Sequence, residues 1–248
     1  MFPTRDDNPT LGRSNVTVAI VALNLLAWAF VQGLGSEAAL AKSVCELGAI
    51  PGELLRRVAS GTSVPLGPGI ACLIDAQPDW STTVTHMFLH GGWFHLIGNL
   101  WFLWVFGDNV EDAMGGARFA VFYVLCGLAA FAAQALTNPS SPIPMVGASG
   151  AIGGVMGAYA RLYPRAPVHL LVIFFVFVNR TVVPAFLMLG YWFLIQVLGG
   201  IPAFASEAGG VAFWAHVGGF AAGVLLIALF RDPELVRRHP IHGRTRRG

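Results

Sequence analysis

The sequence predicts an all-α polytopic membrane protein, a six-helix bundle with a large first outer loop. Its composition, six apolar stretches and the placement of positive charge all favour this class. Apolar residues make up 55% of the 248 positions and charged residues only 11%, whereas a soluble domain carries about 25% charged residues. Lipid is therefore the solvent that suits most of the chain. The small net charge of +2 does not indicate nucleic-acid binding.

Six apolar stretches have the character of membrane-spanning helices. A straight span needs roughly 17–25 apolar residues, and several of these stretches lie at the short end of that range. The predicted spans are 16–31, 94–110, 119–136, 149–163, 182–198 and 211–230. The first is expected to be a span and not a cleaved signal, because it lacks a convincing cleavage site. The apolar segment 168–178 is shorter, and we expect it to be interfacial or re-entrant. A seventh span there would move the two chain ends to opposite sides of the membrane.

Positive charge lies almost entirely on one side of this six-span arrangement. The short outer loops 137–148 and 199–210 hold no Lys or Arg, and Lys42, Arg56 and Arg57 fall in the long outer loop, where the bias counts least. The inner segments hold the arginines at 5, 13, 118, 161, 165, 180, 231, 237, 238, 244, 246 and 247. This asymmetry predicts a multi-pass integral protein of the cell (inner) membrane with both termini cytoplasmic.

The chain divides into three predicted parts. Residues 1–15 form a cytoplasmic segment, 16–230 a membrane domain with an outer loop at about 34–92, and 231–248 a basic, disordered cytoplasmic tail. Cys45 and Cys72 both lie in the outer loop, where a disulfide is permitted, although two buried free thiols fit equally well. Cys126 lies inside the third span and is expected to fill apolar space.

A serine opens the fourth span, in Gly147-Ala148-Ser149-Gly150. Polar groups inside a membrane domain are costly and often mark function. As a helix N-cap, the Ser149 hydroxyl would only bond a free backbone N–H. The flanking glycines favour another interpretation, because they let a substrate approach Ser149 closely. The backbone N–H groups of a helix start can also face a developing oxyanion.

A histidine lies early in the sixth span, and Gly219 and Gly223 follow it on a smooth helical face. The fourth span has a similar face that starts at Gly150, so the two backbones are expected to press together. Both helices begin on the outer side, which would place Ser149 and His216 at similar depth. A serine within hydrogen-bond reach of a histidine is an activated nucleophile. No Asp or Glu is placed to orient His216, so the sequence predicts a dyad.

His95 and Asn99 are four residues apart and share one face of the second span. Both can donate hydrogen bonds to an oxyanion. Three histidines within ten residues also allow a metal site, but no acidic residue in a span offers a further ligand. We expect His86 and His90 to anchor loops through hydrogen bonds. The acidic run 108–112 is expected to form a turn that pairs with Arg118.

Together these motifs resemble the rhomboid family of intramembrane serine proteases, over about residues 80–223. The resemblance implies a six-helix rhomboid-like bundle that needs no metal and no cofactor. It implies that Ser149 is the nucleophile and His216 the general base, with His95, Asn99 and the Ser149 backbone N–H stabilising the oxyanion. The supporting positions that it implies are His90, Gly147, Gly150, Gly219 and Gly223. The implied substrates are single-span membrane proteins, cut within membrane lipid near the outer face.

Two departures from the family pattern concern the surroundings of the site. Some members carry an aromatic residue four positions after the serine, packed on the catalytic histidine, where this chain has Gly153. Trp80 is followed by Ser81 and not by arginine. We expect the loop 199–210 to act as a lid and the stretch 182–198, with Trp192 and Phe193, to form a side gate.

Three other functions fit the sequence less well. A catalytically inactive relative could bind transmembrane helices as a chaperone or trafficking factor, but the chain retains Ser149, His216, His95 and Asn99. A lipid-modifying metalloenzyme would need more histidines than this chain has. A transporter would need acid–base pairs inside the membrane or repeated halves. The sequence makes no prediction of the oligomeric state.

Overall fold

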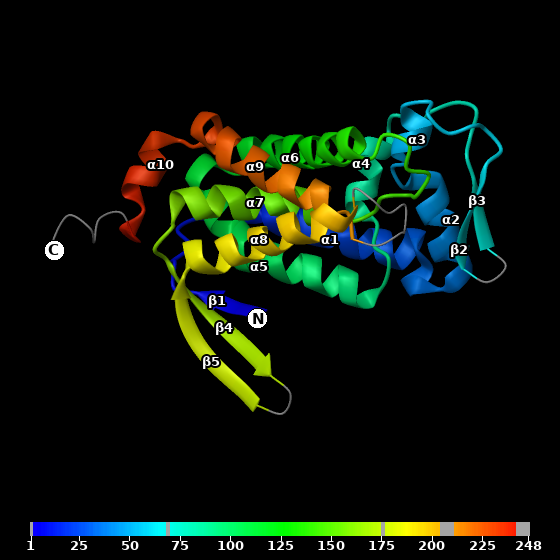
Figure 1. The fold of residues 1–248 in the computed structure, drawn as a ribbon. Helices are drawn as coiled ribbons and strands as arrows, with labels where there is room; N and C mark the ends of the chain where they lie inside the picture. The colour runs from blue at the N-terminus through cyan, green and yellow to red at the C-terminus, as the bar shows by residue number, and fades with distance from the viewer. Residues whose placement is uncertain (1, 68–69, 175–176, 204–210, 242–248) are drawn as a thin grey trace.

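The six longest helices run roughly side by side in the computed structural model of the chain (Figure 1), which describes residues 2–67, 70–174, 177–203 and 211–241. They are α1 (Asn15–Leu26), which continues as the π-helix Ala27–Val31, α5 (Trp93–Met114), α6 (Gly116–Thr137), α7 (Ser149–Leu162), α8 (Ala185–Ala203) and α9 (Phe213–Phe230). Each helix overlaps one of the six predicted spans. The predicted class, a polytopic helical membrane protein, is confirmed.

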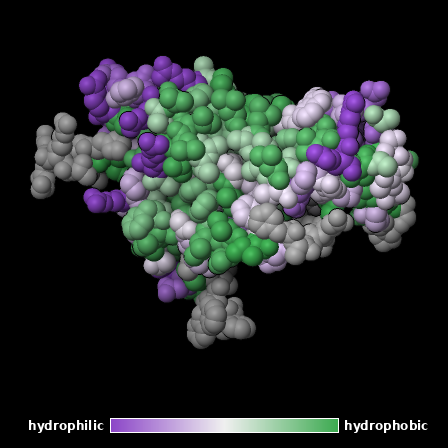
Figure 2. Space-filling view, turned by 45° about the horizontal axis from the view of Figure 1, so that its top comes forward, coloured by the Kyte–Doolittle hydropathy of each residue, from purple (hydrophilic) through white to green (hydrophobic). Residues whose placement is uncertain are grey.

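Among the described residues, three helices are long and apolar enough to cross a membrane: α6, the Ala185–Pro202 part of α8, and α9. Asn15–Val31 is a shorter apolar helix. Apolar side chains cover the middle of the face seen in Figure 2, and hydrophilic side chains gather towards its two ends. Such a surface suits lipid between two polar layers. A crossing by all six helices stays a prediction.

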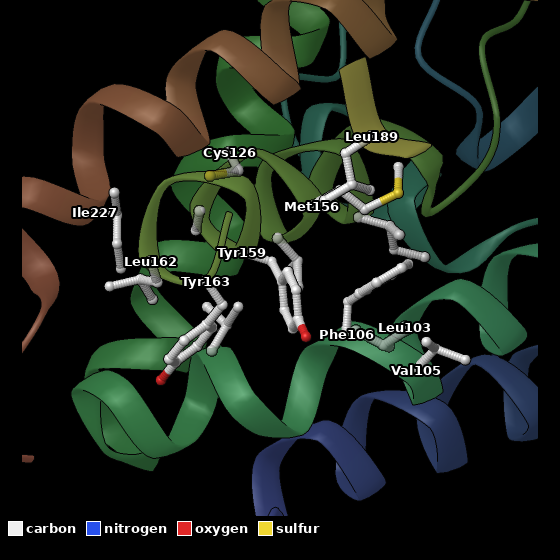
Figure 3. Close-up of a cluster of buried hydrophobic side chains, with 14 of the residues drawn as sticks. Leu103, Val105, Phe106, Cys126, Met156, Tyr159, Leu162, Tyr163, Leu189 and Ile227 are labelled. Carbon is white, nitrogen blue, oxygen red and sulfur yellow. The ribbon is translucent and has the colours of Figure 1, made fainter. Parts of the chain in front are cut away.

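The short helix α7 lies at the centre of the bundle and contacts α5, α6, α8 and α9. Most of its residues are buried, and the largest cluster of buried apolar side chains surrounds it. In Figure 3 Tyr159 of α7 lies beside Phe106 of α5, and their ring centroids are 4.9 Å apart. Small residues along α7 let its neighbours approach its backbone closely. The helix is therefore held by protein on every side.

The loop end of the bundle carries the segments that join α1 to α5. They are the 3-10 turn Gly33–Gly35, α2 (Glu37–Leu47), α3 (Pro51–Leu54), β2 (Ser63–Gly67), β3 (Ile70–Leu73), α4 (Thr82–Thr85) and the 3-10 turn His86–Phe88. A disulfide joins Cys45 of α2 to Cys72 of β3, with Cα atoms 5.4 Å apart. The sequence did not decide between a disulfide and two free thiols, and the structure has the disulfide. It ties the small hairpin to α2 and restricts the unfolded loop.

The opposite end of the bundle, the sheet end, carries an antiparallel sheet in the order β1-β4-β5. Its strands are β1 (Phe2–Asp6), β4 (Pro167–Phe174) and β5 (Phe177–Pro184). Residues 168–174 and 177–178 thus belong to two paired strands, because their β-branched and aromatic residues favour strands. Pro167 pairs with Pro184 at the base of the hairpin, so the chain returns to the end it left and makes no seventh crossing. Residues 182–184 belong to β5, so the fifth predicted span begins at 185 and not at 182.

The acidic run 108–112 is helical, and the prediction that it forms a turn paired with Arg118 was wrong. Glu111 accepts hydrogen bonds from the N–H groups of Val16 (3.0 Å) and Thr17 (2.8 Å), at the start of α1. A carboxylate at that position satisfies free N–H groups and faces the positive end of the helix dipole. Arg118 instead lies 3.5 Å from Asp232.

Residues 231–241 of the tail are ordered, so the prediction of a disordered tail was wrong for them. Asp232 caps α10 (Pro233–Arg238) by accepting from the backbone N–H groups of the first turn, and a proline at the first helical position favours this start. His239 is buried, and its Nε2 lies 3.0 Å from the carbonyl of Pro9. The segment 242–248, with His242 and the last arginines, lies outside the described residues.

Asp6 at the end of β1 is a half-buried acid that faces Tyr159, whose hydroxyl donates a hydrogen bond to it. The pKa of Asp6 is raised to about 6, mainly by burial and also by the nearby Asp108, while the Tyr159 hydrogen bond acts to lower it. An acid whose pKa is raised on folding stabilises the fold at low pH. That contribution is lost as pH rises from the ordinary pKa of 3.8 through about 6.

We therefore expect Asp6→Asn to stabilise the protein at pH 7.5 and to have less effect at pH 4.5. After allowance for partial exposure, the gain is on the order of 1 kcal/mol, or about 2–4 °C in the unfolding midpoint. Thermal unfolding in detergent at both pH values measures it. An equal gain at both would mean that ionisation of Asp6 is not the cause.

Candidate active site

Ser149 is the first residue of α7, and the backbone turns into the helix just before it. Gly147 has φ of +131°, a conformation that favours glycine, and its N–H donates to the carbonyl of His86 at 2.9 Å. Ala148, not Ser149, occupies the N-cap position. The interpretation of Ser149 as a helix cap was therefore wrong. Its hydroxyl is free to point at α9.

The Ser149 Oγ lies 2.7 Å from the Nε2 atom of His216, on the second turn of α9. Glycines set this approach, because a Cβ at Gly219 would overlap the carbonyl of Gly150. A Cβ at Gly223 would likewise overlap backbone atoms of Gly154, one turn further along both helices. The two backbones are thus in direct contact, as small-residue faces permit, and this contact brings the hydroxyl and the imidazole together.

His95 of α5 lies on the other side of Ser149. Its Nδ1 accepts a hydrogen bond from the N–H of Gly91 at 3.2 Å, so Nε2 carries the proton of the neutral ring. That Nε2 edge faces Gly147, where a Cβ would come within 2.8 Å of it. Glycine at 147 therefore makes room for the ring. The arrangement presents an N–H donor beside the serine.

Asn99 lies one turn after His95 on α5 and is buried. Its side-chain amide donates to the His95 carbonyl at 3.0 Å. An amide has two N–H groups, so one remains to serve a ligand. The structure thus brings Ser149, His216, His95 and Asn99 to one place.

These four residues line a pocket of about 200 Å³ between α5, α7, α8 and α9. Its remaining walls are mostly apolar, and the complete lining is Phe94, His95, Gly98, Asn99, Phe102, Ser149, Ile152, Met156, Trp192 and His216. A small apolar pocket with a few convergent polar groups is the usual form of a ligand site. Two of its residues, Phe94 and Trp192, come from α5 and α8, which both contact α7.

Gln196, which lies on α8, was not predicted as a site residue from the sequence. Its Oε1 lies 2.8 Å from the Nδ1 of His216. The Trp192 ring, one turn earlier on α8, lies 5.8 Å from the His216 ring. It occupies the aromatic position that Gly153 leaves open, since a Cβ at Gly153 would be 3.7 Å from the Trp192 ring. A polar residue inside an apolar span was the signal that could have revealed Gln196.

His90 is fully buried, and its ring packs edge-on against His95 with centroids 5.2 Å apart. Its ring nitrogens have no hydrogen-bond partner among the described residues, so the prediction that this ring anchors a loop by hydrogen bonds was wrong. The backbone does so instead: Gln32 bonds both the N–H and the carbonyl of His90, each at 2.8 Å. His86, also buried, packs on Phe131. Within the described ranges no three His, Cys, Asp or Glu side chains are placed to hold a metal.

The predicted lid and side gate fall on α8 and the segment after it. Gly199 and Gly200 are helical and belong to α8, so the loop is shorter than predicted. Residues 204–210 lie outside the described part of the chain. Trp192 and Phe193 both pack on Phe220 of α9, with ring centroids 6.1 Å and 4.7 Å away.

Fold and site together define a polytopic helical membrane protein with a hydrogen-bonded serine and histidine in a pocket between its helices. The rhomboid domain model matches residues 77–233, which include all four residues around the pocket. The chain belongs to the rhomboid family.

Three relatives illustrate the similarity. Rhomboid protein 1, mitochondrial, of Saccharomyces cerevisiae is 32% identical over 164 residues, 60% of this chain and 42% of that protein. Rhomboid protease GluP of Bacillus subtilis is 40% identical over 83 residues, 34% of this chain and 16% of that protein. Rhomboid-like protein 11, chloroplastic, of Arabidopsis thaliana is 38% identical over 78 residues, 32% of this chain and 28% of that protein. The chain thus matches less than half the length of each.

The glycine contact between α7 and α9 predicts a specific sensitivity to one methyl group. Gly219→Ala would push the new Cβ into the Gly150 carbonyl, and overpacking of this kind costs about 1–3 kcal/mol. Thermal unfolding in detergent should show a lower midpoint. Gly190→Ala on α8 is the matched control, because a Cβ there meets nothing within 4 Å. An unchanged midpoint for Gly219→Ala would contradict the direct backbone contact.

Proposed function

We propose that the chain is an intramembrane serine endopeptidase that cuts single-span membrane proteins within their transmembrane segments. The single observation that carries this proposal is the 2.7 Å contact between Ser149 Oγ and His216 Nε2. The contact lies in a pocket that opens among membrane helices. A serine hydroxyl is a weak nucleophile until a neighbouring base takes its proton. Membership of a family that includes proteins named as proteases supports the same activity.

The mechanism uses His216 twice. Its Nε2 takes the hydroxyl proton as Ser149 Oγ bonds to the scissile carbonyl carbon, and it returns that proton to the leaving amine. A water molecule then attacks the acyl-enzyme as His216 accepts one of its protons, and His216 returns that proton to Ser149 Oγ as the second product leaves. No cofactor takes part.

The developing oxyanion is stabilised by donors on both sides of Ser149. They are the Nε2–H of His95, the side-chain amide of Asn99 and the backbone N–H of Ser149 at the start of α7. Donors held rigidly where charge develops lower the barrier more than donors that must reorganise. His95 is held by its bond to Gly91 and Asn99 by its bond to the His95 carbonyl.

The substrate class follows from the location of the pocket. A transmembrane helix hides its carbonyls in its own hydrogen bonds, so a substrate must unwind where it meets Ser149. Ser149 is near the loop end of the bundle, since the segment before it bonds to Ala49 and Gly52 there. Cleavage is therefore proposed near the outer end of the substrate helix.

In the proposed orientation the protein lies in the cell (inner) membrane, and its sheet end faces the cytoplasm. Residues 1–15 and the tail 231–248 are then cytoplasmic, and 16–230 form the membrane domain. The described ends of the chain lie together, because residues 5–9 and 240–241 line one pocket. The arginines at 5, 118, 165 and 231 belong to segments of this end, as expected for a cytoplasmic face.

Purified protein in detergent should cleave a model single-span substrate, and Ser149→Ala should abolish cleavage, a loss of at least about 10³-fold. A fluorophosphonate probe should label Ser149 in the parent protein and not in His216→Ala. Ser149→Ala should still bind the substrate, whether the parent is a protease or an inactive chaperone or trafficking factor. A parent protein that binds the substrate without cutting it would identify the inactive function. Equal cleavage by parent and Ser149→Ala would end the proposal.

Removal of one oxyanion donor should slow the chemistry without a matching loss of substrate binding. We expect His95→Ala to reduce kcat by about 10²–10³-fold while KM changes by less. Steady-state cleavage in detergent gives both constants. The control is His169→Ala, which removes a histidine of β4 at the sheet end that bonds Asp7. A change in KM alone would assign His95 to substrate binding.

A further inference from the structure

We propose that Gln196 is a positioning residue that holds His216 in the one tautomer able to accept the Ser149 proton. This inference rests on the proposed function and deepens it: α8 supplies the third member of the site. The two ring nitrogens of a neutral histidine differ, and the partner of one decides which carries the proton. His216 bonds Gln196 through Nδ1 at 2.8 Å and Ser149 through Nε2 at 2.7 Å.

The orientation of the Gln196 amide is set by its own helix. Its Nε2 donates to the backbone carbonyl of Trp192 at 3.3 Å, so the oxygen, and not the nitrogen, faces His216. An amide oxygen can only accept a hydrogen bond. The Nδ1 of His216 must therefore carry the proton, and the lone pair of Nε2 faces the serine hydroxyl. The opposite tautomer would leave two acceptors facing each other.

Burial makes the hydrogen bond between Gln196 and His216 costly to lose. Gln196 is only 7% exposed, and an amide buried in apolar surroundings without a partner is costly. Its neighbours Leu194 and Leu198 on α8 are more than half exposed and face away from the bundle. The Gln196 side chain thus points into the bundle from a helix whose other residues are mostly apolar. The ring that it bonds is His216, the base of the proposed dyad.

The same helix also supplies the ring that packs on His216. Trp192 and Gln196 are one turn apart on α8, so both contacts depend on where α8 lies. Movement of α8 away from α9 would separate both groups from His216 together. A substrate helix that displaced α8 would therefore have to let it return before the serine could be activated. In this arrangement the position of α8 therefore determines whether His216 is oriented to accept the Ser149 proton.

The test compares Gln196→Met, which keeps the length and loses the acceptor, with Gln196→Glu, which keeps an acceptor oxygen. The readouts are the second-order rate of fluorophosphonate labelling at Ser149 and kcat and KM for a model substrate. We expect Gln196→Met to lower the labelling rate and kcat by about 10–10²-fold, with KM changed less than about threefold. Gln196→Glu should remain within about threefold of the parent in all three. Leu194→Met, on the exposed side of α8, is the matched control and should equal the parent.

The outcomes separate this inference from the proposed function. If the parent cuts and Gln196→Met labels as fast as the parent, the positioning role is overturned while the protease survives. If Gln196→Glu falls as far as Gln196→Met with an unchanged unfolding midpoint, the acceptor is irrelevant and the role is again overturned. If the parent neither cuts nor labels, both proposals fail. Gln196→Asn, too short to reach Nδ1, replaces Gln196→Met should that variant not fold.

Discussion

The direct contact of two helix backbones is the constraint on which the rest of this structure depends. Gly219 and Gly223 of α9 lie against Gly150 and Gly154 of α7 so closely that no side chain fits between them. In lipid there is little hydrophobic force between helices, so close packing of small residues holds them together. This contact fixes the distance between Ser149 and His216. The pair would separate if either face carried larger side chains, whatever the chemistry of the two residues.

Irregular backbone near the site is stable because other parts of the chain satisfy its polar groups. Backbone N–H and C=O groups cannot be left unpaired where water is excluded. Gly147 donates to the His86 carbonyl, and the Gln32 side chain bonds both backbone groups of His90. The loop end, tied by its disulfide, is therefore part of what shapes the pocket. At the sheet end, the Glu111 carboxylate accepts hydrogen bonds from the free backbone N–H groups at the start of α1.

Helix α8 differs from the rest of the bundle in how it is held and in what it supplies. Much of its surface is exposed and apolar, yet its Trp192 packs on the His216 ring and its Gln196 bonds the ring nitrogen that does not face Ser149. Trp192 fills the space above Gly153, so the aromatic ring beside the histidine comes from α8 and not from α7. Gln196 supplies the acceptor in place of a carboxylate. The base is thus oriented from a helix that is less firmly packed than α7.

Periodicity, glycine spacing and charge asymmetry were enough to predict the six helices, their order and the four polar residues at the pocket, because these are local properties of the chain. The ordered tail, the start of the fifth span and the partners of Glu111 and Arg118 were mispredicted, because they depend on segments about a hundred residues or more apart or on a choice between helix and strand. The sequence does show Gln196 as a polar residue inside an apolar span, but it does not show its role, for the same reason. A lone glutamine in an apolar span has a meaning only once the tertiary structure decides which side chain its oxygen faces.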